Sequence, residues 1–352
     1  MSEIYSEHAR LAPSSAHRWC LCAASVSRSE GIPNEDTEDS LRGTEAHAFL
    51  ESLINRTEYV SPPNSLIDAS DVDAVHEVVE YVTNNISKLP PKSEVTVDIG
   101  KLFGRDDCWG TMDIQMFKGY EIELPDYKNG MEVVEPFENK QLLLYGLGVM
   151  GEFAMGKSGI TFPDDYPIKL TIAQPRAEVR GAHPDGPIRS WVVTYGELMG
   201  KWATYFKERM EATDDPNAPA NPSSEACTWC LAKKIPGRCP EIENQSLAAA
   251  QAVFAPMATT KLKATLQDNV SRDPADLSPD QLAYILNHEK MIKGWLTAVK
   301  DYAQEFVLKG GLIPGQKVVT GPGSRNWKKE AEVTGELLKL TKKDGTQVVT
   351  SD

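Results

Sequence analysis

The spacing of apolar residues changes from helical to strand-like near residue 93, and this change most constrains the fold. Apolar residues recur at helical spacing over 71–88, at Val72, Val75, Val78, Val79, Val82 and Ile86. Alternation of apolar and polar residues then predicts strands over 95–99, 111–117, 121–127, 170–173 and 190–193. Further helices are expected over 13–30, 43–55, 138–154 and 197–212. The mixture of helices and successive strands predicts an α/β fold.

The rest of the chain is expected to form loops and a C-terminal helical region. Loops are predicted over 31–42 and 214–224, and Ser70–Asp73 resembles a capping box at the start of the helix 71–88. The composition changes after Glu243, where two long helices are expected over 245–269 and 278–308, before a β-prone tail at 316–320. We therefore predict a domain over 1–242 and a second region over 243–352.

Composition limits the class of protein. The net charge of −14 argues against a broadly basic surface, so any contact with DNA phosphates would be confined to a groove. No apolar run approaches the ~20 residues of a membrane span. The sequence MSEIYSEHARLAPSS has no basic segment followed by an apolar core, so we expect no secretion and favour the cytoplasm. In a reducing compartment, six cysteines more often bind metal than form disulfides.

Two aspartates, a histidine and a lysine occur on the predicted elements in a pattern that suits a divalent-metal site. Asp113 and Asp126 lie on adjacent predicted strands, and carboxylates are ligands for Mg²⁺ or Mn²⁺. His47, on the helix 43–55, would add a nitrogen ligand, which favours Mn²⁺ somewhat. Lys128 is two residues after Asp126, so both side chains share a face of the strand. There the ammonium could orient a water molecule and stabilise charge on a phosphate.

The following helix and nearby aromatic residues extend this pattern. Gln141 and Tyr145 are one helical turn apart and share a face, where they could position Lys128 and a scissile strand. Trp109 or Tyr127 could stack on a base, although a role in the core is the better default for both.

Each residue also has a plainer interpretation. A charged surface strand would explain Asp126 and Lys128, and His47 could be a packed histidine. Pro125 predicts that its strand is an edge strand or is bulged there. Glu123, expected on the same face, is a less favoured alternative ligand. The ordered set of residues favours the metal site.

The C-terminal cysteines have a metal-binding spacing. In Cys227-x2-Cys230-x8-Cys239, the two-residue gap lets neighbouring thiolates bind one metal centre. With a fourth thiolate, the set would suit zinc or an iron–sulfur cluster. Buried cysteines without a metal are the alternative.

The order of elements and motifs resembles the core of the PD-(D/E)XK nucleases, in their RecB-type branch, over roughly residues 10–240. The resemblance rests on Gly43-Thr44-Glu45-Ala46-His47, Gly110-Thr111-Met112-Asp113, Asp126-Tyr127-Lys128 and the Gln141–Tyr145 motif. It implies a central mixed sheet flanked by helices. It also implies hydrolysis of phosphodiester bonds, with His47, Asp113, Asp126 and the backbone carbonyl of Tyr127 as metal ligands.

The cysteine pattern, with Cys22 upstream, resembles the iron–sulfur nuclease domains of AddB and of the CRISPR-adaptation nucleases. This resemblance implies a [4Fe–4S] cluster held by Cys22, Cys227, Cys230 and Cys239, in preference to structural zinc. Cys22 is preferred to Cys20 because Trp19-x2-Cys22 matches the spacing of those domains, although Ala23 replaces their usual proline. The cluster would staple the two ends of the domain, and Cys20 and Cys108 would be ordinary thiols.

Several segments are similar to a family of phage-borne RecB-like proteins. They are Leu11–Trp19, Gly43–His47, Gln174-Pro175-Arg176, Gly311–Lys317 and Arg325-x-Trp327. The similarity implies an exonuclease that processes DNA ends in the bacterial cytoplasm, beside a phage single-strand-binding or annealing protein. Gln174, Arg176 and Arg325 could contact phosphates or have structural roles. A structure-specific endonuclease and a non-catalytic DNA- or partner-binding module are the alternatives, and an oligomer such as a ring is possible.

Overall fold

A five-stranded sheet forms the centre of the described part of the chain. The computed structural model describes residues 9–85, 89–156, 160–180, 183–235, 237–246 and 279–314. The chain divides into two compact units, Met1–Val299 and Lys300–Asp352, and the sheet belongs to the first. Its strands are β1 (Lys92–Asp98), β2 (Trp109–Phe117), β3 (Ile122–Tyr127), β4 (Pro167–Ala173) and β5 (Ile188–Thr194).

The strands follow one another across the sheet in chain order. β1, β2 and β3 form an antiparallel meander, β4 runs parallel to β3, and β5 is antiparallel to β4. The parallel step from β3 to β4 needs a long crossover, and helix α5 (Lys140–Met155) lies within it. The predicted α/β fold with a mixed sheet is thereby confirmed.

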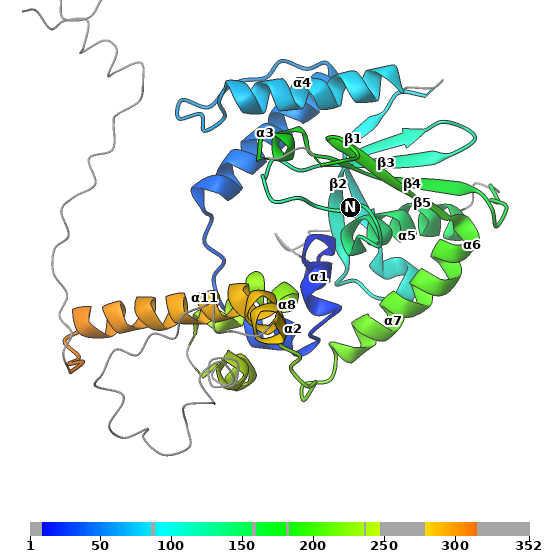
Figure 1. The fold of residues 1–352 in the computed structure, drawn as a ribbon. Helices are drawn as coiled ribbons and strands as arrows, with labels where there is room; N and C mark the ends of the chain where they lie inside the picture. Colours follow the sequence, from blue (N-terminus) through cyan, green and yellow to red (C-terminus); the bar gives the residue numbers. More distant parts are fainter. Residues whose placement is uncertain are drawn as a thin grey trace, which may run out of the picture. The chain divides into compact units, whose positions relative to one another are not determined.

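Helices cover both faces of the sheet (Figure 1). α3 (Glu38–Asn55) and α4 (Ala69–Asn84) pack on one face, where Leu50 and Val78 share a core with Ile114 of β2. α5 packs on the other face, where its apolar residues join Leu124 of β3 and Leu170 of β4. Tyr127 belongs to the α3–α4 side, so alternate residues of β3 serve opposite cores.

Two helix starts differ from the prediction because capping residues were not recognised. Residues 38–42 are helical and not loop, because Thr37 caps α3 by accepting from the amide of Ser40. The capping box of α4 is Asp68 with Asp71, not Ser70–Asp73, and the helix begins at Ala69. The predicted helix 13–30 is three short helices, η1 (Pro13–Ser15), α1 (Ala16–Trp19) and α2 (Ala24–Ser29).

The prediction that Pro125 marks an edge strand or a bulge is wrong. β3 is the central strand, and Pro125 pairs with Thr171 of β4 in an uninterrupted parallel register. The amide of Lys128 donates to the carbonyl of Ala173 in β4. Because the amides of successive residues in a strand point to opposite edges, the backbone nitrogen of Pro125 faces β2. The β2–β3 pairing ends at Glu123, so Pro125 lacks an N–H only where no partner strand remains.

The remaining elements complete the architecture. They are η2 (Gly100–Phe103), η3 (Pro175–Arg180), α6 (Tyr195–Glu197), η4 (Leu198–Trp202), α7 (Ala203–Ala212), α8 (Ser224–Thr228), η5 (Leu231–Lys234) and α11 (Pro279–Leu308). α11 matches the helix predicted over 278–308. The helix predicted over 245–269 and the tail over 316–320 lie, apart from 245–246, outside the described residues, and the boundary at 243 stays a prediction. In the parts of the chain that are described, no helix is both long and apolar enough to span a membrane.

Candidate metal site and cysteine cluster

The end of the β2–β3 pairing creates the centre of the candidate site. Beyond Glu123 the two strands no longer exchange ladder hydrogen bonds. Instead the amide of Tyr127 donates to Asp113 Oδ2 over 2.7 Å. A carboxylate that accepts a backbone N–H in this way is fixed in place, and its second oxygen remains available to a ligand.

His47 approaches this second oxygen from α3. Its Nδ1 lies 3.4 Å from Asp113 Oδ1, and its ring packs 5.3 Å from the ring of Tyr127. Burial acts to lower the pKa of His47, but the charge and hydrogen bond of Asp113 together with the charge of Asp126 outweigh it, and the pKa lies above its ordinary value. The structure therefore brings together the histidine and the first carboxylate, which are 66 positions apart in the sequence (113 − 47).

Asp126, Lys128 and Gln141 form a closed triangle on the α5 side of β3. Lys128 Nζ is 2.7 Å from Asp126 Oδ2 and donates to Gln141 Oε1 over 3.0 Å. Gln141 Nε2 donates in turn to Asp126 Oδ1 over 3.0 Å. Gln141 thus orients both groups, as its position on the helix predicted.

Tyr145 supports this triangle from one turn further along α5. Its hydroxyl donates to the carbonyl of Thr111 over 2.7 Å and also interacts with Gln141. The tyrosine therefore ties α5 to β2 and holds Gln141, which in turn accepts from Lys128.

Glu94 is a member of the site that the sequence did not reveal. Ligand atoms of His47, Glu94 and Asp113 all lie within 4.8 Å of one another. Ser93 pairs with Ile114 and Val95 with Met112, so Glu94 lies across the β1–β2 ladder from Asp113. Its φ of 48° is in the left-handed region, a strained conformation for a residue other than glycine. The predicted strand began at 95, one residue too late to include it.

The electrostatics of the site show an excess of negative charge. Burial and the charge of Asp113 raise the pKa of Glu94 to about 7. Burial, together with Asp113, also raises the pKa of Asp126 despite the neighbouring Lys128. Burial disfavours the charge of Lys128 as well, yet Asp126 and Asp113 keep its pKa above the ordinary value. A bound cation would stabilise the charged forms of the three neighbouring carboxylates, Glu94, Asp113 and Asp126.

The donor set fits a hard divalent ion. Asp126 Oδ2 is buried and, in the described structure, only Lys128 approaches it. Carboxylate oxygens with a single imidazole are ligands suited to Mg²⁺ or Mn²⁺. His47, Glu94 and Asp113, whose ligand atoms all lie within 4.8 Å of one another, would hold such an ion, and the predicted ligand Asp126 lies outside this group.

The alternative ligand Glu123 belongs to the opposite face of the sheet, which corrects its expected placement. It is fully buried and accepts from Thr171 Oγ1 over 2.7 Å, from the hydroxyl of Tyr81 and from Lys118. Lys169 lies 3.2 Å away. Three residues separate Glu123 from Asp126, so alternation turns the two side chains apart.

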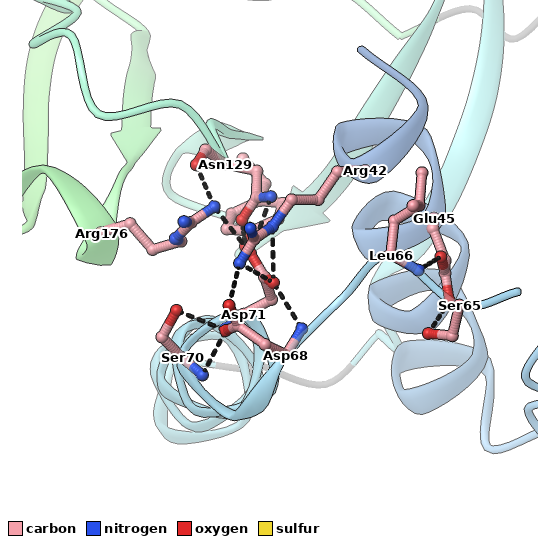
Figure 2. Close-up of polar contacts among 10 residues, drawn as sticks. Arg42, Glu45, Ser65, Leu66, Asp68, Ser70, Asp71, Asn129 and Arg176 are labelled. Carbon is pink, nitrogen blue, oxygen red and sulfur yellow. Dashed lines mark hydrogen bonds and ion pairs between the residues drawn. The ribbon is translucent and has the colours of Figure 1, made fainter. Parts of the chain in front are cut away.

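The segment Gln174-Pro175-Arg176 is buried in a polar network. Gln174 is fully buried and bonds to the backbone of Gly130, Glu132 and Val134. Arg176 is 8% exposed and lies 2.7 Å from Asp71 (Figure 2). These contacts favour structural roles over the predicted contacts with phosphates. Arg325 lies outside the described residues.

Asp71 is the centre of that network. At the start of α4, its carboxylate receives Arg42 Nε at 2.8 Å, Asn129 Nδ2 at 3.0 Å and the amide of Asp68 at 2.7 Å (Figure 2). Since Arg42 is on α3 and Asn129 follows β3, the network joins both helices to the end of the strand that carries Asp126. Buried charges of this kind are stable only when fully paired.

Glu45, within the Gly43–His47 motif, also has a structural role. Its carboxylate accepts from the amide of Leu66 over 2.7 Å and from Ser65 (Figure 2). It also accepts from the hydroxyl of Tyr59 over 3.0 Å. These bonds attach the connection between α3 and α4 to the helix that carries His47.

Four cysteines, Cys22 and the three between 227 and 239, gather near α2 and α8. The thiols of Cys22, Cys230 and Cys239 interact electrostatically with that of Cys227, and burial raises the pKa of Cys227 to about 12. The amide of Asn221 donates to Cys22 Sγ over 3.3 Å, and Arg28 Nη1 donates to Cys239 Sγ over 3.2 Å. The structure thus brings the four predicted cysteines into one neighbourhood.

Cys20 and Cys108 belong to a different environment. Both are buried in the core on the α5 side of the sheet, and burial raises the pKa of each thiol. Tyr127 is also fully buried, and its hydroxyl donates to Asn129, so the structure favours a core role for this ring over base stacking.

One protein-family model matches nearly the whole chain. The model described as "Protein of unknown function (DUF2800)" matches residues 8–349. The match includes His47, Glu94, Asp113, Asp126, Lys128 and the four gathered cysteines. The chain belongs to the DUF2800 family.

Proposed function

We propose that this protein is a Mg²⁺- or Mn²⁺-dependent deoxyribonuclease that processes DNA ends. The observation that carries the proposal is the convergence of His47, Asp113, Asp126 and Lys128 from three separate stretches of the chain. The order of helices and strands, compatible with a PD-(D/E)XK core, supports the same class of enzyme.

The residues of the site suit hydrolysis of a phosphodiester. A bound divalent ion would supply Lewis acidity to a phosphoryl oxygen and to the attacking water. Asp126 and Gln141 hold the ammonium of Lys128 in place, and Gln141 also holds Asp126. Because the carboxylates keep Lys128 protonated, it would stabilise negative charge on the phosphate and orient the water rather than accept a proton. Water adds to phosphorus, the P–O bond to one nucleoside breaks, and that oxygen leaves with a proton.

The four gathered cysteines would hold a [4Fe–4S] cluster. In the described residues, no three of their sulfur atoms all lie within 4.8 Å of one another. Sulfur ligands 2.3 Å from one zinc ion would lie about 3.8 Å apart, so the wider arrangement favours the larger group. Absorbance near 400 nm with bound iron after anaerobic purification would support the cluster, whereas a colourless protein with one equivalent of zinc would exclude it.

The proposal includes a setting that rests on sequence resemblance alone. The protein would act in the cytoplasm of a bacterium, on DNA produced during phage recombination or replication, beside a single-strand-binding or annealing protein. Co-purification of the tagged protein with such a partner from infected cells would test this setting.

Digestion of end-labelled DNA tests the activity directly. Linear single-stranded and duplex DNA and closed circular DNA are incubated with Mg²⁺, Mn²⁺ or EDTA. We expect cleavage of linear DNA that requires the ion and is lost in Lys128→Ala, while Lys207→Ala, an exposed lysine on α7, stays active. Cleavage of circles would favour the endonuclease alternative. Full activity in Lys128→Ala would contradict the proposed site.

A further inference from the structure

A pocket of about 700 Å³ opens next to the proposed catalytic groups. Lys128 and Gln141 line one part of it, so it is continuous with the triangle that contains Asp126. Its volume is in the range that accepts a ligand the size of a nucleotide. Whatever enters the pocket therefore lies beside Lys128.

Two exposed aromatic rings line this pocket. Phe137 precedes α5 and is 65% exposed, and Trp229 is 68% exposed. Trp229 lies between Cys227 and Cys230, so the cysteine loop carries its ring to the pocket. Large exposed rings beside a nuclease site are suited to stacking on bases, and they can do so only when the bases are not already stacked in a duplex.

The pocket is lined by charges of both signs, with the lysines Lys128, Lys140 and Lys290 and the glutamates Glu132, Glu135, Glu138 and Glu225. Glu135 and Glu138 line it and are paired with His183 at 2.9 Å and Lys201 at 3.6 Å. Acceptor oxygens of this kind repel a run of phosphates but can receive amino groups of bases. Phosphates would remain on the side of Lys128.

His17 gives a further reason to expect a ligand. It lines the pocket from α1, and its Nε2 is buried without a hydrogen-bond partner in the described structure. A buried polar atom without a partner is uncommon, and a bound ligand is one way to satisfy it.

We propose that this pocket binds unpaired bases of single-stranded DNA next to the bond to be cleaved, with Phe137 and Trp229 as stacking platforms. This inference rests on the proposed nuclease function, because the pocket lies next to the bond to be cleaved only if Lys128 is a catalytic residue. It makes single-stranded DNA the preferred substrate.

Binding in EDTA tests the pocket without cleavage. Fluorescence anisotropy compares a labelled single-stranded 20-mer with a blunt hairpin duplex. We expect Phe137→Ala and Trp229→Ala each to weaken single-strand binding about tenfold, and the double variant about a hundredfold, with little effect on the hairpin. Phe137→Tyr and Trp229→Phe should restore most of the affinity. Tyr120→Ala is the matched control, because Tyr120 is 69% exposed and does not line the pocket.

A second assay separates this inference from the proposed activity. Hydrolysis of thymidine 5′-(p-nitrophenyl phosphate) reports the proposed metal site, so its rate should be lost in Lys128→Ala and kept in the control Tyr120→Ala. Single-strand affinity within twofold of the wild type in the double variant, or an equal loss for the hairpin, would overturn the pocket. Affinity that depends on both rings in a protein that cleaves no DNA would support the pocket and refute the nuclease.

Discussion

The backbone amide of Tyr127 donates to the side chain of Asp113 where the pairing of their two strands has already ended. Asp113 thus has two tasks, since one oxygen closes the gap in the sheet and the other faces His47. The two tasks respond differently to substitution.

Asparagine and alanine at position 113 should separate these tasks. Asp113→Asn keeps an oxygen for the Tyr127 amide, so we expect near wild-type stability with loss of divalent-ion binding. Asp113→Ala also leaves a buried N–H without a partner and should cost a further ~1–3 kcal/mol. Urea unfolding measures the first effect and isothermal titration with Mn²⁺ the second. Equal stabilities of the two variants would show that the hydrogen bond contributes little.

Glycine at position 94 should weaken metal binding but make the protein more stable than alanine does. Because Glu94 has a φ of 48°, Glu94→Gly removes strain and should be about 1 kcal/mol more stable than Glu94→Ala. Both variants should bind Mn²⁺ more weakly than the wild type. The measurements are melting temperature and Mn²⁺ titration. Unchanged Mn²⁺ affinity in both would remove Glu94 from the site.

Loss of Asp71 should destabilise the fold strongly. Asp71→Ala leaves Arg42 and Arg176 without their shared buried partner, which should cost about 3–5 kcal/mol. Asp68→Ala, which removes the partly exposed cap of the same helix, should cost only about 1 kcal/mol. Chemical denaturation of both variants tests the contrast, and similar losses would contradict the central position of Asp71.

Glu123 should make stability fall in acid. Burial acts to raise its pKa, but hydrogen bonds from Lys118, Tyr81 and Thr171 and the charge of Lys169 together outweigh it and hold the pKa below its ordinary value. A lowered folded pKa gives stability that is present above the unfolded pKa of about 4.3 and is lost as the pH falls through the folded pKa. Glu123→Gln should be less stable at pH 7 by about 3 kcal/mol, with a difference that shrinks below pH ~4.

Denaturation of the wild type and Glu123→Gln at several pH values between 2 and 7 checks this prediction. A difference in unfolding free energy that is constant over the range would show that the carboxylate has the same pKa in the folded and unfolded chains.

Substitution of cysteines should divide them into two classes. Cys227→Ala should lose bound iron and lower the melting temperature, because the link between the two chain ends is gone. Cys108→Ala should keep its iron and lose only packing, since that thiol lies in the core on the α5 side. Iron analysis and thermal melting distinguish the classes. Loss of iron in Cys108→Ala alone would reassign the ligands.

The sequence predicted the parts of the site whose spacing matches local structure. Asp126 and Lys128 alternate on a strand, and Gln141 and Tyr145 repeat on a helix, so periodicity alone placed them. Glu94 was not predicted as a site residue, because its position depends on the register between β1 and β2 and on an unusual φ. Neither feature can be recognised from hydrophobic alternation.

Polar residues in the core were the other limit of prediction. Glu123, Gln174 and Arg176 are charged or polar, and sequence alone suggests exposed or functional roles for such residues. The structure buries all three residues beside partners from distant segments of the chain. Asp71, for example, is the partner of Arg176. A partner 105 positions away (176 − 71) leaves no local signal in the sequence.

The attachment of α3 at Arg42 has a consequence for His47, five residues further along the same helix. The helix rises about 7.5 Å over that distance, so the imidazole is held by a rigid arm whose fixed end is at Asp71. In the proposed metal site, the contacts that fix α3 would therefore be separate from the side chain that binds the ion. Substitutions at His47 would then change the affinity for the ion, while the contact between Arg42 and Asp71 continues to stabilise the fold.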